Sequence, residues 1–185
     1  MKARRTFVEK HFARGAWERV LAVQPADDLR SAQGVLTPSA WFPFEMGERL
    51  DKAIAEVLGG GKTEIFEQIG AQSAHENLAG IHRPFLQPGN PEKFLEKTGA
   101  IYAFYYDTGR REFQPLGSQE GIRTTDDAET CSAADCLTVI GWHKEALRLC
   151  GADRVEMHET ECRAAGSAVC RSRIRRTLKG GMGPA

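Results

Sequence analysis

The chain has 185 residues, of which 41% are apolar, and this size and composition suit one globular domain with a buried core. Lys plus Arg and Asp plus Glu balance at 25 each, so charge favours neither nucleic acid nor a membrane surface as partner. No apolar run approaches the roughly 20 residues that span a bilayer, and the basic N-terminus lacks the apolar core of a secretory signal. We therefore expect a cytoplasmic single domain over residues 1–179, a disordered tail over 180–185, no membrane span and no nucleic-acid partner.

Helical patterns dominate the first half of the chain. Apolar residues at positions 46, 50, 54, 57 and 58 form the stripe of an amphipathic helix, which the glycines at 59–61 end. The sequence Asn90-Pro91 is typical of an N-cap followed by proline in the first turn. Other expected elements are an arm or short helix over 1–14, a helix over 16–24, a loop from Gly34 to Phe44, a helix over 63–80, and a helix from Pro91 to Ala103 or beyond, where the run IYAFYY could instead be a strand.

The second half changes to strand patterns around one further helix. We expect a hairpin over 110–116 and 119–124, a helix over about 136–149, and two strands over 153–161 and 168–176 that turn about Gly166. The predicted fold class is α+β, in which a helical front half packs on a small antiparallel ββαββ sheet. Alternating Arg171, Arg173 and Arg175 are typical of the solvated face of an edge strand.

A metal site is the main chemical prediction. The pattern C-x22-E-x2-C-x7-C contains Cys136, Glu159, Cys162 and Cys170, and an odd total of five cysteines argues against a disulfide framework. Three thiolates and a carboxylate favour zinc, and four protein ligands would fill its coordination shell, so the site would be structural rather than catalytic. Two alternatives stay open: a disulfide between Cys162 and Cys170, or four unconnected buried thiols.

The spacing of these residues makes a geometric demand on the chain. Cys162 and Cys170 are equidistant from Gly166, so a hairpin that turns there sets them opposite each other. Glu159 and Cys162 are an odd number of positions apart, and a straight strand would point them to opposite faces. The strand must therefore bend or bulge near residues 160–161 if the four residues share one ion.

These residues also carry a resemblance to a known family. The stretch CLTVIGW from Cys136, together with ETECRAAGSAVC from Glu159 to Cys170, resembles the 4-vinyl-reductase domain in the sensor domains of phenol-responsive bacterial activators. The pattern covers only about residues 130–176; the front half is more loosely similar to uncharacterised myxobacterial paralogues. The resemblance implies zinc on the same four residues and a fold similar to trafficking-complex subunits and the haem–nitric-oxide domain, with an apolar pocket between helices and sheet.

The resemblance implies a non-catalytic ligand-binding or signalling domain that takes a small hydrophobic molecule or lipid and reports to a downstream signalling protein. Candidate pocket residues are Tyr102, Tyr105, Trp142 and His143. A homodimer through the front half is expected from Trp41, Phe42 and Phe44, which lie in a proline-bounded loop, and from Trp17.

Three alternative functions exist beside this one. A dimerising interaction subunit without ligand stays open. A haem-based gas sensor is conceivable through His75 or His82, although the Tyr-x-Ser-x-Arg clamp of the haem–nitric-oxide domain is missing. An enzyme with Cys131 or Cys150 as nucleophile has no support beyond a spare thiol.

Overall fold

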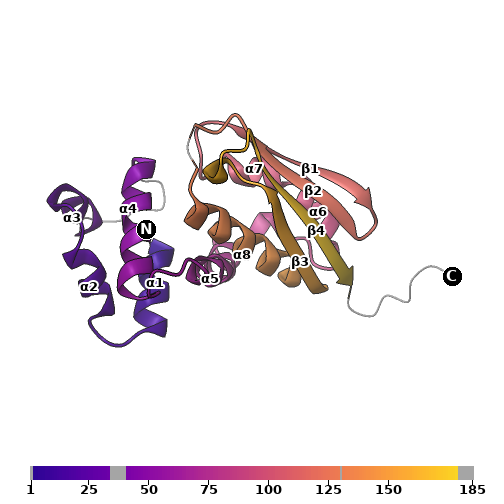
Figure 1. Ribbon diagram of the computed structural model, residues 1–185. Coiled ribbons are helices and arrows are strands. Elements are labelled where there is room, and N and C mark those ends of the chain that lie inside the picture. Colours follow the sequence, from indigo (N-terminus) through magenta and orange to yellow (C-terminus); the bar gives the residue numbers. More distant parts are fainter. Residues whose placement is uncertain (1, 34–40, 130, 179–185) are drawn as a thin grey trace.

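The computed structural model describes residues 2–33, 41–129 and 131–178, which form a group of N-terminal helices beside a half built on a sheet (Figure 1). The expected tail over 180–185 and the greater part of the expected loop from Gly34 lie outside these ranges. None of the helices within them is both long and apolar enough to cross a membrane.

The N-terminal group consists of four helices with a core of their own. Its helices are α1 (Lys2–His11), α2 (Ala16–Ala22), α3 (Ala26–Gln33) and α4 (Phe44–Val57). Trp17 is only 7% exposed and packs in this core with Val8, Ile54 and Phe66. Trp17 therefore adds no exposed apolar surface for a partner, contrary to the expectation from sequence.

The middle of the chain contains α5 (Ile65–Ala79), a short 3-10 helix (Arg83–Phe85), α6 (Pro91–Glu96) and α7 (Thr98–Tyr102). The side chain of Asn90 accepts a hydrogen bond from the Lys93 amide at 3.0 Å, which confirms the predicted N-cap. The predicted single helix from Pro91 is interrupted at Lys97. There the hydroxyl of Thr98 donates to the Leu95 carbonyl at 2.8 Å and competes with the helical hydrogen bonds.

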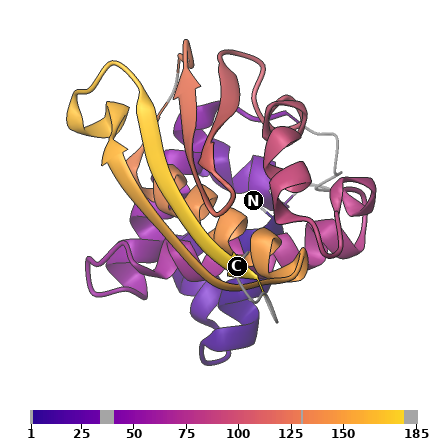
Figure 2. The ribbon, with the colours of Figure 1, turned by 90° about the vertical axis from the view of Figure 1, so that its right-hand side faces the viewer.

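The C-terminal half confirms the predicted ββαββ order. Its elements are β1 (Arg110–Gly117), β2 (Glu120–Asp126), α8 (Ala133–Leu149), β3 (Ala152–Glu161) and β4 (Cys170–Leu178). The strands form one antiparallel sheet in the order β1-β2-β4-β3, which curves in front of α8 in Figure 2. The prediction that β4 is an edge strand is wrong, because β2 and β3 pair with it on both sides. The exposed Arg173 and Arg175 instead form ion pairs with Glu120 on the neighbouring strand.

Helices α5 and α8 join the two halves through an unusually close backbone contact. A Cβ atom added at Gly141 would lie 1.9 Å from the Glu67 carbonyl oxygen, and one added at Gly70 would lie 2.0 Å from that of Thr138. No side chain fits in either gap, so glycine at both positions lets the two helix backbones meet. A salt bridge of 2.7 Å between Lys144 and Glu67 crosses the same contact.

This contact makes a stability prediction. Gly141→Ala should lower the free energy of unfolding by about 1–3 kcal/mol, because the new methyl group must push α5 and α8 apart. The matched control is Gly47→Ala in α4, where an added Cβ meets nothing within 4 Å and should raise stability by about 0.5–1 kcal/mol. Urea unfolding measures both, and equal effects of the two substitutions would show that the crossing is not tight.

Candidate functional site

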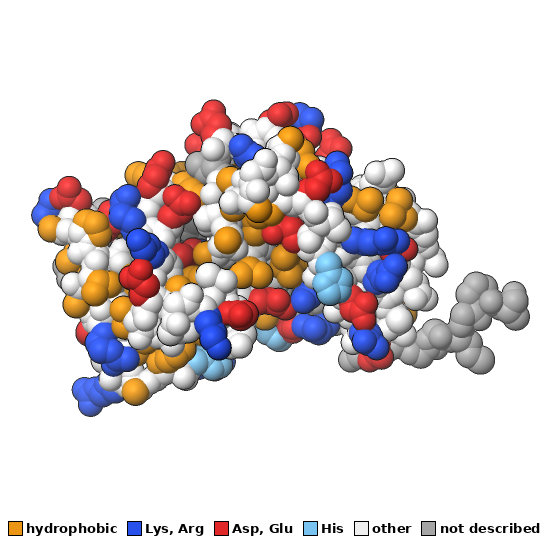
Figure 3. Space-filling view, viewed as in Figure 1, with side chains coloured by type: hydrophobic (Ala, Val, Ile, Leu, Met, Phe, Trp, Pro, Cys, Tyr) orange, Lys and Arg blue, Asp and Glu red, His pale blue; other side chains and the backbone are white. Residues whose placement is uncertain are grey.

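A cavity of about 620 Å³ lies between the N-terminal helices and the C-terminal half. Its lining comes from α1, the start of α4, α5 and the turn after it, the end of α7 with the following residues, and α8. Figure 3 shows apolar side chains gathered in the hollow between the two halves, with charged groups around it. This volume is within the range of roughly 300–1,000 Å³ that is usual for small-molecule sites.

Of the four pocket residues expected from sequence, Tyr105, Trp142 and His143 line this cavity. Tyr102 does not line it; this side chain is 3% exposed and borders a much smaller void. Its hydroxyl donates to the Thr108 carbonyl at 2.7 Å and its ring stacks on Tyr106. Tyr102 is therefore a packing residue beside the cavity.

Three nearly buried side chains that line the cavity have ring nitrogens without a hydrogen-bond partner. These atoms are Nδ1 and Nε2 of His82, Nε2 of His143 and Nε1 of Trp142. The exposed fractions of the three residues are 1%, 2% and 7%. Because most buried polar groups in proteins are hydrogen-bonded, unpartnered nitrogens from separate elements around one cavity point to a bound molecule that meets them.

His143 is held in one tautomer by its own helix. Its Nδ1 lies 2.8 Å from the Val139 carbonyl oxygen, which can only accept, so Nδ1 carries the proton and Nε2 has the lone pair. Burial, followed by the nearby positive charges of Arg123 and Arg111, holds the pKa of His143 well below its ordinary value. The ring is therefore neutral.

His82 lies in the turn after α5. Its ring makes edge contacts with Phe85, Phe104 and Tyr105, at centroid distances of 5.8, 5.1 and 5.3 Å. Burial lowers the pKa of His82, so this imidazole is also neutral. His75, the other histidine considered from sequence, has a side chain that is 59% exposed and pairs with Glu145 instead.

A carboxyl group that sequence reasoning missed also lines the cavity. Asp135 is half-buried at the start of α8, where the Tyr106 hydroxyl lies 2.7 and 2.9 Å from its two oxygens. Burial raises the pKa of Asp135 and raises that of Tyr106 well above its usual value. Ser132 caps α8 by accepting from the Asp135 amide at 3.1 Å. The Ser-x-x-Asp pattern could have placed Asp135 in the first turn of a helix, but not beside Tyr106.

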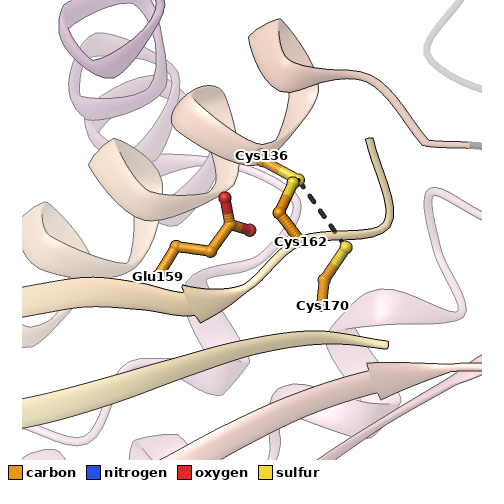
Figure 4. Close-up of side chains that lie close together, drawn as sticks. All are labelled: Cys136, Glu159, Cys162 and Cys170. Atoms are coloured by element: carbon orange, nitrogen blue, oxygen red, sulfur yellow. Dashed lines mark hydrogen bonds between the residues drawn. The ribbon is translucent and has the colours of Figure 1, made fainter. Parts of the chain in front are cut away.

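A second cluster of side chains lies next to the cavity, at the junction of α8 and the sheet. The ligand atoms of Cys136, Glu159, Cys162 and Cys170 all lie within 4.8 Å of one another (Figure 4). The Cys136 sulfur is 3.8 Å from those of Cys162 and Cys170. The pairing of β3 with β4 shifts register between Glu159 and Glu161, which confirms the predicted irregularity that lets Glu159 and Cys162 face the same point.

Within this cluster, Cys170 is the thiol whose surroundings favour the thiolate, whereas the pKa values of Cys136 and Cys162 are raised. Cys136 donates to Cys170, which lowers the pKa of the Cys170 thiol and raises that of Cys136, and the Arg163 amide also donates to Cys170 at 3.4 Å. Arg123 is 1% exposed and donates to Ser172 at 3.0 Å, and burial lowers its pKa to about 9. Arg123 thus places a buried positive charge near the thiols.

All five cysteines are free thiols, so the alternative of a disulfide between Cys162 and Cys170 does not describe this state of the chain. Cys150 is buried and its sulfur lies 3.5 Å from the Gln87 amide that donates to it. Cys131 is half-buried beside the small void. Neither of these two thiols is part of the four-residue cluster.

Comparison with known proteins adds a likeness in structure alone. No family model and no curated protein matches the sequence. An H-NOX protein from S. oneidensis in the Fe(II)NO ligation state superimposes with a TM-score of 0.71 at 11% identity, over 95% of this chain and 96% of that one. An unliganded Fe(II) H-NOX variant from K. algicida gives 0.69 at 8% identity, over 95% and 93%. An oxygen-binding H-NOX domain related to soluble guanylate cyclases gives 0.63 at 14%, over 98% and 93%.

These findings correct two expectations from the sequence. The assignment to the 4-vinyl-reductase domain is wrong, because it rests on about 47 residues (130–176), whereas the likeness to H-NOX structures extends over nearly the whole chain. Zinc as the cofactor is also wrong on this comparison: the neighbours are described as Fe(II) proteins, and a group of thiols with one carboxylate is not by itself evidence for zinc. The chain has the fold of these H-NOX proteins.

Proposed function

We propose that this chain is a haem-based sensor domain for a diatomic gas, and not an enzyme. The observation that carries the proposal is the cavity of about 620 Å³, whose lining includes two buried, neutral imidazoles with unpartnered nitrogens. The likeness to H-NOX structures described as NO and oxygen complexes supports it. The haem sensor considered from sequence is thus better supported than a zinc protein with a lipid pocket.

The residues around the cavity fit a haem group. Histidine and tyrosine are among the side chains that hold haem iron in proteins, and His82 and His143 offer ring nitrogens here. Ile101, Val139 and other apolar side chains suit a flat macrocycle, and Arg111 on the same lining would supply positive charge for its carboxylates, whereas Arg4 is already paired with Asp51. Arg111 would take the part of the missing Tyr-x-Ser-x-Arg clamp.

A ferrous haem would supply an iron atom that binds a small gas. The role of the protein would be to exclude water and to hold the group between the two halves of the fold. Because the lining comes from α1, α4 and α5 as well as from α8, an occupant touches both halves, and a change at its centre can alter how they sit together. We propose that a downstream signalling protein detects this change.

A lipid or other hydrophobic molecule suits this cavity less well. Arg4 and Asp51, which form a partly buried ion pair, contribute to the lining, as do Asp135 and Glu48. A purely apolar ligand would take these charged groups further from water without adding a hydrogen bond to any of them, which costs free energy. A molecule with an apolar body and polar groups is the better match.

The purified full chain should bind one haem per chain, with a saturable Soret band and a raised melting temperature, because a ligand that binds only the folded state stabilises it. Val139→Trp places a large side chain in the cavity and should abolish the band. Val23→Trp is the control, because Val23 is 58% exposed and does not line the cavity. Absorbance titration would refute the proposal if the unaltered chain gave no saturable band, or if Val139→Trp bound haem as well as Val23→Trp.

We also propose that Cys136, Glu159, Cys162 and Cys170 hold a thiophilic metal ion separate from the haem. Metal–sulfur bonds of about 2.3 Å in a tetrahedron place the sulfurs about 3.8 Å apart, and the Cys136 sulfur lies 3.8 Å from two others. The buried Glu159 Oε1 has no hydrogen-bond partner, and a metal ion would provide one. Such an ion would tie the start of α8 to β3 and β4.

If this proposal holds, elemental analysis of the full chain will find about one metal ion per chain, and its identity follows from the same measurement. Cys136→Ser should reduce the content to near zero, because Cys136 is the sulfur in contact with both other thiols. Cys131→Ser is the control, since Cys131 is a free thiol outside the cluster. Equal metal contents in the two variants, or none in the unaltered chain, would contradict the proposal.

The expected homodimer stays a proposal. Fewer aromatic residues now support it, because Trp17 is buried. Trp41 is 61% exposed beside the cavity, where Ile81 and Phe104 are also largely exposed. Sedimentation velocity at micromolar concentration should give a dimer, and Trp41→Ala combined with Phe44→Ala should shift it to a monomer of 20.4 kDa. A monomer without substitution would argue against the dimer, and a dimer that persists in the double variant would place the interface elsewhere.

A further inference from the structure

The cavity lining offers four side chains of the types that can ligate haem iron: His82, His143, Tyr105 and Tyr106. Both phenol oxygens already have partners. Tyr106 donates to Asp135, and the Tyr105 oxygen accepts from Asn77 at 2.8 Å. Burial raises the pKa of each phenol, which opposes the phenolate that iron would need. The choice is therefore between the two imidazoles.

His143 is the less favourable of the two. A guanidinium nitrogen of Arg123 lies 3.4 Å from its Nδ1, and this nitrogen already donates to the Val139 carbonyl. The Arg123 contact is thus a neighbouring positive charge and not a hydrogen bond to the ring. Iron on the opposite nitrogen would add positive charge to an imidazole that is already beside a buried cation, and this raises the free energy of the complex.

His82 has none of these constraints. Neither ring nitrogen has a hydrogen-bond partner, and the ring is fixed by the edges of three aromatic rings. No cation takes part in these contacts, and burial is the only cause of the lowered pKa. His82 also lies in a turn, whose backbone can adjust more easily than the middle of α8.

On the basis of the proposed function, we propose that His82 is the axial ligand to the iron of a haem bound in this cavity. Iron would bind the unprotonated ring nitrogen, which otherwise stays buried without a partner. His143 would then remain a neutral side chain of the cavity wall, beside Arg123.

The test is an absorbance titration of the full chain with haem, in ferric and ferrous states, for the unaltered protein and three variants. His82→Ala should lose the Soret band of histidine-ligated haem, and added imidazole should restore it by entering the space left by the side chain. His82→Phe keeps the aromatic contacts with Phe85 and Phe104, so it should lose the band without loss of folding. The matched control is His158→Ala on β3, an exposed histidine that does not line the cavity, and this variant should keep the band.

The outcomes separate this inference from the function on which it rests. A histidine-type band retained in either His82 variant, or lost in His158→Ala as well, overturns the assignment of His82 and leaves a haem protein. No saturable haem binding by the unaltered chain overturns the proposed function itself. Loss in both His82 variants, with rescue by imidazole in His82→Ala, supports the inference.

Discussion

The close approach of α5 and α8 is the constraint on which the rest of this structure depends. α5 contacts the N-terminal helices through α1, and α8 lies against β3 and the rest of the sheet, so their contact joins two cores that otherwise share few side chains. Glycines at positions 70 and 141 let the two backbones meet directly. The spacing of the halves, and hence the depth of the cavity beside the crossing, is fixed by backbone atoms, which yield less than side chains.

This arrangement makes α8 the element that both candidate sites share. Asp135 lines the cavity, while the next residue, Cys136, belongs to the thiol cluster. Arg123, on β2, lies near both sites. One of its guanidinium nitrogens is 3.4 Å from Nδ1 of His143, and the charges of Cys136 and Cys170 act on the same guanidinium. A molecule or ion bound at either site would therefore restrict the position of the start of α8. Because a helix moves as a rigid body, this restriction would also act on the other site.

Local signals in the sequence predicted much of the fold, since they depend on neighbours along the chain. The Asn90 cap, the hairpin of β1 and β2, and the irregularity after Glu159 all follow from a few adjacent residues. The central place of β4 could not be predicted in this way, because Arg171, Arg173 and Arg175 alternate equally on an edge strand and on a central one. The full lining of the cavity was also beyond reach, since it joins α1 to α8 across the whole chain, although Tyr105, Trp142 and His143 were expected at a pocket. The short cysteine motif, taken without the rest of the chain, led to the incorrect assignment to the 4-vinyl-reductase domain.

The unpartnered ring nitrogens of residues on the cavity lining also bear on the stability of the fold. Each unpartnered buried donor or acceptor costs about 1–3 kcal/mol, and the whole of a domain's stability is only about 5–15 kcal/mol. The ring nitrogens of His82, His143 and Trp142 belong to residues of the cavity lining, so a part of this cost lies there. A ligand that gives these nitrogens a partner would return that free energy to the folded state. Its binding would therefore stabilise chiefly the turn after α5, which carries His82, and the middle of α8, which carries Trp142 and His143.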